Sequence, residues 1–232
     1  MDERQPGAPI PTGFTRLDAA LGVGGLPRGR IVELFGPDSS GKTTLALQAI
    51  AHLQNNGGTA AWIDAEHVFD AAYAVKSGVA IERLPVAQPE SAEQALAIAH
   101  RLAVSEAVDL LVIDSAAALV PKLELEAGIG DSSPGLHGRV LASGLRRLSR
   151  AVARTDTAVV FLNQTRSRLE SSGGETETTA GGPALKLYAA VRIALYPAGG
   201  RVRFRVLKNK VATAFGEGEL ELQPGSGFVE TP

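Results

Sequence analysis

The chain has no cysteine, and this absence excludes several kinds of site. Its 232 residues contain no thiol, so disulfide bonds, thiolate metal sites and cysteine nucleophiles are ruled out. Long apolar runs are also missing: no stretch approaches the roughly 18 residues of a membrane span, and residues 1–5 are charged where a signal peptide would be apolar. We therefore expect a cytoplasmic protein with no membrane partner.

The chain also has little net charge. Its 23 basic and 25 acidic side chains leave a formal charge of −2. No overall electrostatic field draws such a molecule to nucleic acid or to an anionic membrane. Any site for a polyanion must therefore be a local patch of basic residues.

Length and composition favour one large α/β domain. A chain of 232 residues with 44% hydrophobic content can bury a single substantial core. Residues 1–10 are rich in proline and glycine and are predicted to be a flexible N-terminal segment. Residues 11–232 are predicted to form the domain, and they contain no internal repeat.

Hydrophobic periodicity predicts a parallel sheet. The predicted strands are the apolar runs 31–35, 59–63, 84–87, 110–113 and 159–162. The predicted helices cover 13–21, 43–55, 68–77, 91–104 and 136–155. Strands that alternate with helices indicate a mostly parallel sheet with helices on both faces. Residues 191–195 and 202–207, joined by a Pro-Ala-Gly-Gly turn, predict an antiparallel hairpin at the edge of this sheet.

A P-loop is the most specific motif in the chain. Residues 36–44 match G-x-x-x-x-G-K-[ST] where a strand turns into a helix, so backbone N–H groups can hold a phosphate. Gly36 and Gly41 permit a close approach of the backbone. Lys42 brings a charge to the β- and γ-phosphates, and the Thr43 hydroxyl can bind Mg²⁺. The predicted nucleotide-binding residues are Gly36, Pro37, Asp38, Ser39, Ser40, Gly41, Lys42, Thr43 and Thr44.

Three polar residues follow predicted strands at the same edge of the sheet. Asp114 ends the run 110–113 in the form of a Walker B carboxylate that supports Mg²⁺, although a helix cap has the same pattern. Glu66 would lie near the γ-phosphate and could orient or deprotonate water, or it could be a solvated loop carboxylate. Gln164 could contact the γ-phosphate through its amide, or serve only as a hydrogen-bonded turn residue.

Taken together, these segments resemble the ATPase core of the bacterial RecA recombinase family from about residue 11 to residue 228. The segments that carry the resemblance are 24–33, 36–44, 64–67, 129–132, 163–164, 177–179 and 208–210. The resemblance implies a RecA-like P-loop NTPase fold, in which a mostly parallel central sheet with helices on both faces ends in a C-terminal antiparallel hairpin. It also implies ATP and Mg²⁺ as cofactors.

The resemblance assigns roles around the nucleotide. It implies that Lys42 and Thr43 serve the phosphates and Mg²⁺, with Asp114 as metal support. It also implies that Glu66 is the catalytic carboxylate and that Gln164 senses the γ-phosphate.

The resemblance further implies that Asp70 and Tyr73 flank the adenine, although Tyr73 on a helix could equally pack in the core. Lys208 and Lys210 are one residue apart on a strand-like segment and should share a face. In the family such lysines reach the ATP of a neighbouring subunit and act in catalysis. The alternative is a pair of solvated lysines on an edge strand.

By resemblance, the loops 126–135 and 165–182 hold single-stranded DNA. Arg166 and Arg168 open the second loop, and Leu169 matches an apolar position that can wedge between bases. Arg139 and Arg146 lie on the basic face of the helix 136–155, which could bind phosphates or simply be solvated.

Departures from the family pattern predict weak DNA binding and weak assembly. The second loop carries Glu170, Glu175 and Glu177, Pro134 replaces an apolar wedge in the first loop, and Leu187 stands where an interface aromatic is expected. Measured against the family, the sequence begins after the N-terminal helix and stops before the C-terminal domain. We therefore expect weak self-association, or docking on a full-length recombinase.

The leading hypothesis is an ATP-dependent, single-stranded-DNA-binding ATPase of homologous recombination and DNA repair. The alternative is a nucleotide-binding accessory module that docks on a recombinase or repair polymerase and has no strand-exchange activity of its own. A P-loop small-molecule kinase fits less well, because the chain shows no arginine-rich lid and the lysine pair would be unexplained.

Overall fold

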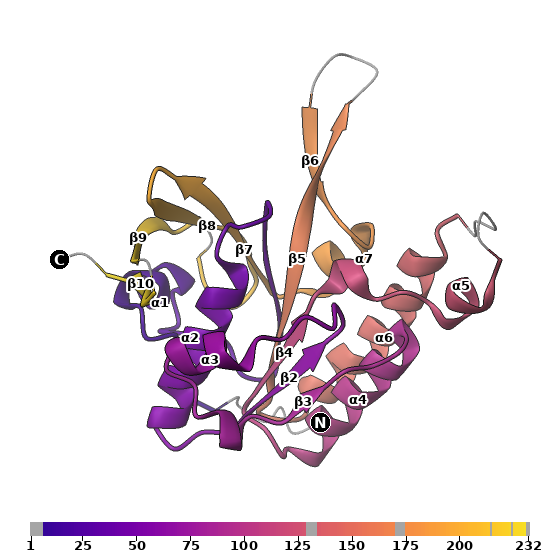
Figure 1. Cartoon of the computed structure of the whole chain (residues 1–232), viewed down its shortest axis with the longest axis horizontal. Helices are drawn as coiled ribbons and strands as arrows, with labels where there is room; N and C mark the ends of the chain where they lie inside the picture. Colours follow the sequence, from indigo (N-terminus) through magenta and orange to yellow (C-terminus); the bar gives the residue numbers. More distant parts are fainter. Residues whose placement is uncertain (1–6, 129–133, 170–174, 214, 224, 231–232) are drawn as a thin grey trace.

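The central feature of the computed structural model is a mixed β-sheet with helices packed on both faces (Figure 1). The structure describes residues 7–128, 134–169, 175–213, 215–223 and 225–230. Within these residues ten strands form one sheet in the order β10-β9-β8-β7-β1-β5-β4-β2-β3, with β6 paired to β5. The predicted mixed sheet with mostly parallel strands is confirmed.

Six strands make up the parallel part of the sheet. They are β1 (Ile31–Gly36), β2 (Ala60–Asp64), β3 (Val86–Ala87), β4 (Leu110–Asp114), β5 (Ala158–Leu169) and β7 (Val191–Ala198). β1, β2 and most of β4 are buried, because helices cover both of their faces. The strand predicted over 84–87 is reduced to the two residues of β3.

Two hydrophobic clusters lie on opposite faces of the sheet. The first cluster packs α1 (Thr15–Leu21), α2 (Lys42–Asn55) and α3 (Ala71–Lys76) against alternate strand residues such as Val32 and Leu34. The second packs α4 (Ala92–Ser105), α6 (Leu136–Val152) and α7 (Pro183–Tyr188) against the intervening residues such as Ile31. The short helix α5 (Lys122–Glu126) lies further out and has no buried residue.

The predicted hairpin is present and continues into a larger antiparallel extension. β7 pairs with β8 (Arg201–Asn209), β8 with β9 (Glu217–Gln223), and β9 with β10 (Gly227–Val229). Periodicity did not reveal β9, because only Leu220 of its seven residues is buried. β10 consists of only three residues.

The helix predicted over 68–77 begins later than its pattern indicated. The backbone N–H groups of Val68 and Phe69 donate to the buried carboxylate of Asp64, at 3.3 and 2.9 Å, so these residues cannot start a helix. The Asp70 side chain then accepts the N–H of Tyr73 at 2.9 Å and caps α3. The helix predicted over 136–155 starts as expected but ends at Val152.

The prediction of a loop over 165–182 is wrong for much of its length. β5 continues to Leu169 and pairs antiparallel with β6 (Glu175–Thr179), and Figure 1 shows this ribbon projecting from the body of the molecule. The segment is polar, so it lacks the hydrophobic alternation by which a half-buried strand is recognised. Residues 170–174 of this predicted loop, and 129–133 of the first, lie outside the described residues.

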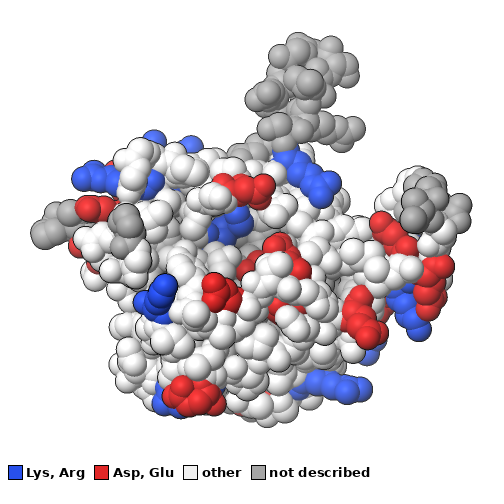
Figure 2. Space-filling view, in the orientation of Figure 1, with Lys and Arg blue, Asp and Glu red and all other residues white. Residues whose placement is uncertain are grey.

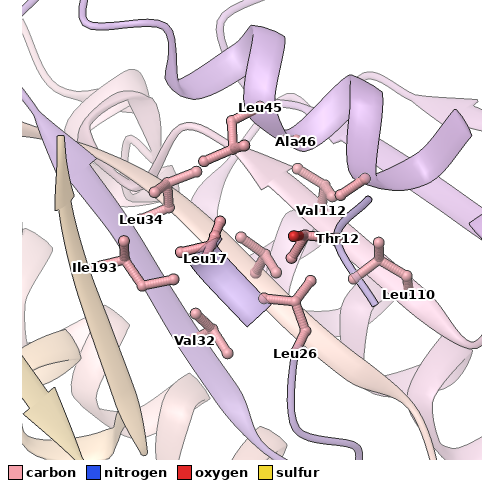
Figure 3. Close-up of a pocket in the computed structure, with 12 residues that line it drawn as sticks. Thr12, Leu17, Leu26, Val32, Leu34, Leu45, Ala46, Leu110, Val112 and Ile193 are labelled. Atoms are coloured by element: carbon pink, nitrogen blue, oxygen red, sulfur yellow. The ribbon is translucent and has the colours of Figure 1, made fainter. Parts of the chain in front are cut away.

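The surface agrees with the small net charge. Figure 2 shows acidic and basic side chains interspersed over the visible face, with no extended basic stripe. Inside, a cavity of about 20 Å³ lies among Leu17, Leu34, Leu45 and Val112, between the helices and the sheet (Figure 3). Its walls are apolar except for Thr12, so it is a packing gap and not a candidate catalytic site.

Candidate active site

The backbone conformation and close packing of the P-loop require glycine at two of its positions. Ser39 and Gly41 have φ angles of 58° and 85°. A Cβ at Gly36 would lie 2.3 Å from the carbonyl oxygen of Leu195, and one at Gly41 would lie 2.3 Å from the Phe228 ring. Only glycine therefore fits at Gly36 and Gly41, and the loop leads directly into the N-terminus of α2.

Lys42 is the first residue of α2, and its side chain folds back over the P-loop. Its Nζ donates to the carbonyl oxygens of Pro37 at 2.7 Å and Gly36 at 3.2 Å, and to the Ser40 hydroxyl at 3.3 Å. Burial lowers the pKa of Lys42, although nearby carboxylates, Asp38 first among them, oppose that shift. A partly desolvated ammonium held by neutral oxygens is suited to an anionic ligand.

Asp114, at the end of β4, contacts Thr43, the residue that follows Lys42. The Thr43 hydroxyl donates to Asp114 Oδ2 at 3.1 Å, although the two residues are 71 positions apart. Burial, followed by the negative charge of Glu66, raises the pKa of Asp114 to about 6. A desolvated carboxylate beside a threonine hydroxyl and a second carboxylate is a donor set that suits Mg²⁺.

Glu66 is held by residues on both sides. Its Oε1 accepts the Ser115 hydroxyl at 2.5 Å, and its backbone N–H donates to the Asp114 carbonyl oxygen at 3.3 Å. Behind it, Asp64 accepts Gln88 Nε2 at 2.9 Å as well as the two backbone N–H groups that delay α3. Asp64 was not identified from the sequence as a positioning residue, although an acidic residue directly after the apolar run 59–63 was a visible signal.

Gln164 lies beside the start of the P-loop, because β5 pairs with β1 and places Gln164 opposite Gly36. Its neighbour Asn163 is fully buried and donates to Glu33 Oε1 at 2.8 Å and to the Ala180 carbonyl oxygen at 3.1 Å. The Ala180 N–H in turn donates to the Gln164 carbonyl oxygen at 3.2 Å. These bonds connect the strand beside the P-loop to the segment that follows β6.

Asp70 and Tyr73 lie close to the P-loop helix, but the contacts that the structure shows are with protein groups. The Tyr73 hydroxyl and Thr44 Oγ1 are 2.6 Å apart, and the ring packs against the first hydrophobic cluster. Asp70 caps α3. The two residues therefore have structural partners, and their place beside the adenine stays a prediction.

Lys208 lies on β8, two strands away from β1, the strand that leads into the P-loop. It pairs across the hairpin with Arg192, which pairs with Glu33 near the start of β1. Its Nζ donates to the carbonyl oxygens of Lys186 at 2.6 Å and Leu187 at 3.2 Å, at the end of α7. Burial, together with the charge of Lys210, lowers the pKa of Lys208.

Lys210 lies just beyond the end of β8. It lines a pocket of about 350 Å³ with Arg28 and Arg30, so three cations meet at this edge. The register of the hairpin shifts between Arg192 and Ile193, which leaves Leu207 as an extra residue of β8 before both lysines. That Lys208 and Lys210 share a face stays a prediction.

The predicted DNA residues lie on α6 and along β5, where Arg166 pairs with Thr178 and Leu169 with Glu175 of the ribbon. Arg139 and Arg146 of α6 line a hollow of about 580 Å³ that Gly181 and Tyr188 also border. Arg146 Nε donates to the Tyr188 hydroxyl at 3.2 Å, and Arg166 is exposed. The side chains of Arg168 and Leu169 lie outside what the structure describes.

In the described ranges, no group of three or more histidine or acidic side chains is arranged to hold a metal ion. Within the same residues, no helix is long and apolar enough to cross a membrane.

The sequence is similar to proteins of one family. The family model for the RecA N-terminal domain matches residues 3–229. The chain is 51% identical over 98% of its length to Protein RecA of Clavibacter michiganensis, and it spans 66% of that protein. It is 50% identical over 94% of its length to Protein RecA of Chloroflexus aurantiacus and 49% identical over 94% to that of Thermus thermophilus, spanning 65% and 68% of them. The chain thus covers about two thirds of the length of these relatives.

Proposed function

The chain belongs to the RecA family, and from that premise we propose that it is an ATPase of DNA recombination and repair that depends on Mg²⁺ and single-stranded DNA. The observation that carries the proposal is the convergence of four side chains at one edge of the parallel sheet. Lys42 and Thr43 come from the P-loop helix, Asp114 ends β4, and Glu66 follows β2. Ligand sites in open α/β sheets lie at this edge.

The described residues suit the chemistry of ATP hydrolysis. Thr43 and Asp114 would hold Mg²⁺, whose charge would offset that of the phosphates. Lys42 would bind the phosphate oxygens in place of the loop carbonyls that hold its Nζ now. Glu66, oriented by the Ser115 hydroxyl, would accept a proton from the water that attacks the γ-phosphorus as the bond to the bridging oxygen of ADP breaks. Gln164, beside Gly36, would contact the γ-phosphate.

The position of Lys208 supports a catalytic site shared between subunits. On the sheet it lies two strands away from β1 and about 10 Å along that strand from Gly36, at 3.3 Å per residue. From these positions, neither Lys208 nor Lys210 would reach the phosphates of a nucleotide bound at the P-loop of the same chain. In a head-to-tail assembly the lysine edge of one subunit would face the P-loop edge of the next.

For single-stranded DNA we propose the base of the β5–β6 ribbon. Arg166 is exposed there, and Arg139 and Arg146 line the adjacent hollow. Arg168 and Leu169 belong to the same strand and complete the proposed contact set. Phosphate contacts would dominate such binding, and with a net charge of −2 its affinity should be low.

A second candidate function is a nucleotide-binding accessory module that docks on a longer recombinase. One observation favours it: Lys208 is occupied by carbonyl oxygens of its own chain, so it is not poised for a neighbour. In such a module ATP would regulate docking, and turnover would be incidental.

Measuring ATP turnover by the purified chain with and without oligodeoxythymidine separates these functions. Turnover that rises with the oligonucleotide supports the DNA-dependent ATPase. ATP binding without DNA-stimulated turnover favours the accessory module. Failure to bind ATP in the presence of Mg²⁺ would contradict both.

A further inference from the structure

We propose that α7 couples the DNA-facing side of the subunit to Lys208, and that the Tyr188 hydroxyl is the positioning residue through which this coupling acts. The inference rests on the proposed function and names a means of regulating its site. It follows from hydrogen bonds at both ends of a helix of only six residues.

The N-terminal end of α7 is tied to the strand beside the P-loop. Ala180, three residues before the helix, receives a hydrogen bond from Asn163 at its carbonyl and donates its N–H to the Gln164 carbonyl oxygen. Between Ala180 and the helix stand Gly181 and Gly182, with φ angles of 81° and 69°. The start of α7 is thus fixed to β5, the strand from which the ribbon projects.

The C-terminal end of α7 is held by Lys208. The carbonyl oxygens at the end of a helix lack partners within that helix, and the Lys208 ammonium supplies donors to two of them, those of Lys186 and Leu187. The favourable end of the helix dipole adds to this attachment. While it lasts, the Lys208 charge is directed at its own α7 and is withheld from a neighbouring subunit.

The same end of the helix is also tied to the DNA-facing side. Tyr188, the last residue of α7, accepts a hydrogen bond from Arg146 Nε at 3.2 Å through its hydroxyl. Arg146 is exposed and lines the hollow at the base of the ribbon. A DNA phosphate is a stronger acceptor for a guanidinium than a phenol is, so bound DNA would draw Arg146 away from Tyr188.

The two attachments lie within three consecutive residues, 186–188. Losing the Arg146 bond would remove one of the restraints on the end of α7, and the carbonyl pair that Lys208 holds would become less well ordered. Lys208 would then be released more easily toward the nucleotide of the next subunit. DNA binding and trans-acting catalysis are connected in this way without any contact between DNA and Lys208.

The first part of the test needs neither DNA nor ATP. Backbone amide hydrogen exchange is measured over residues 185–189, where the Ala189 N–H donates to the Leu185 carbonyl oxygen at 2.8 Å. Tyr188→Phe, Arg146→Ala and Lys208→Ala should each accelerate this exchange several-fold. Arg150→Ala and Lys186→Ala, which remove exposed cations from the same two helices, should not. Unchanged exchange in Tyr188→Phe would overturn the proposal.

The second part adds oligodeoxythymidine at a concentration that saturates binding in fluorescence anisotropy. In the wild type the oligonucleotide should accelerate exchange over residues 185–189, and in Tyr188→Phe, which is already accelerated, it should add less than twofold. An equal response in both proteins would overturn the coupling. If the wild type binds no oligonucleotide, the proposed DNA function fails, whereas the attachment of α7 is still decided by the DNA-free exchange.

Discussion

The two edges of the parallel sheet differ in how complete they are. At the P-loop edge, Lys42, Thr43 and Glu66 all have partners that orient them toward a shared space. At the opposite edge, Lys210 lines a basic pocket, while Lys208 is bonded to the end of α7. In the function proposed above, the first edge would bind a nucleotide within one chain, whereas the second would act in catalysis only beside another subunit. If this account holds, the two edges of the sheet depend on assembly to different degrees.

Removing the Lys42 charge should produce the largest effect. Lys42→Ala is expected to lower ATP turnover by about 10³-fold, because a preorganised charge on the transferring phosphate is lost. Unchanged circular dichroism would show that the fold is retained, and Lys76→Ala, an exposed lysine on α3, serves as the control. Turnover equal to that of the control would contradict the P-loop assignment.

Glu66→Gln should separate binding from catalysis. The amide keeps the shape of the side chain but cannot accept a proton from water, so hydrolysis should fall by about 10²-fold. Affinity for a fluorescent ATP analogue should change little, and Glu82→Gln on the exposed surface should behave as the wild type does. Full turnover in the variant would make Glu66 a solvated loop carboxylate.

Asp114→Asn should remove a proposed Mg²⁺ ligand and, in the absence of Mg²⁺, increase the stability of the folded protein. Because the folded-state pKa is raised to about 6, the folded protein binds the proton more tightly than the unfolded chain does, and this contribution to stability is lost as pH rises from about 4 to about 6. Without Mg²⁺ at pH 7.5, the variant should therefore be more stable than the wild type, by at most about 3 kcal/mol.

Urea denaturation in EDTA at pH 4 and pH 7.5 tests this expectation. The stability advantage of the variant should appear at pH 7.5 and shrink at pH 4, where the wild-type carboxyl becomes protonated. An advantage that is the same at both pH values would mean that Asp114 ionises normally in the folded protein.

The smallest expected effect concerns DNA. Arg166→Ala should weaken oligodeoxythymidine binding modestly. The slope of log K against log[salt] should become shallower by about the amount that one phosphate contact contributes. Arg154→Ala, at the other end of the α6 region, is the control. Affinity that ignores salt, or that survives Arg166→Ala combined with Arg168→Ala, would refute the proposed contact surface.

Local sequence patterns were sufficient to predict the P-loop, whereas other contacts depend on how distant strands pair. The P-loop is one contiguous motif after a buried strand, so composition and spacing were sufficient. Asn163 donates to Glu33 Oε1, and Arg192 Nε donates to Glu33 Oε2. This network depends on the register of β5, β1 and β7, which no single segment encodes. The attachment of Lys208 to α7 could not be foreseen for the same reason.

The β5–β6 ribbon illustrates a second limit. Its paired residues, 165–169 of β5 and 175–179 of β6, are mostly polar and pair with each other rather than with the core strands, so hydrophobic alternation gives no signal. The exposed face of β9 is similar: Glu217 pairs with Arg203 at 2.8 Å and with Arg205 at 3.2 Å across the strands. Cross-strand charge pairs of this kind become visible only once the register is known.

Mixing two inactive variants tests most directly the claim that the catalytic site is shared between subunits. Lys42→Ala lacks the phosphate-binding charge and Lys208→Ala lacks the trans-acting one, so each alone should show only background DNA-stimulated turnover. An equimolar mixture should regain up to about a quarter of wild-type turnover, because that fraction of head-to-tail contacts joins an intact P-loop to an intact Lys208. No recovery in the mixture, or full turnover by Lys208→Ala alone, would contradict the account.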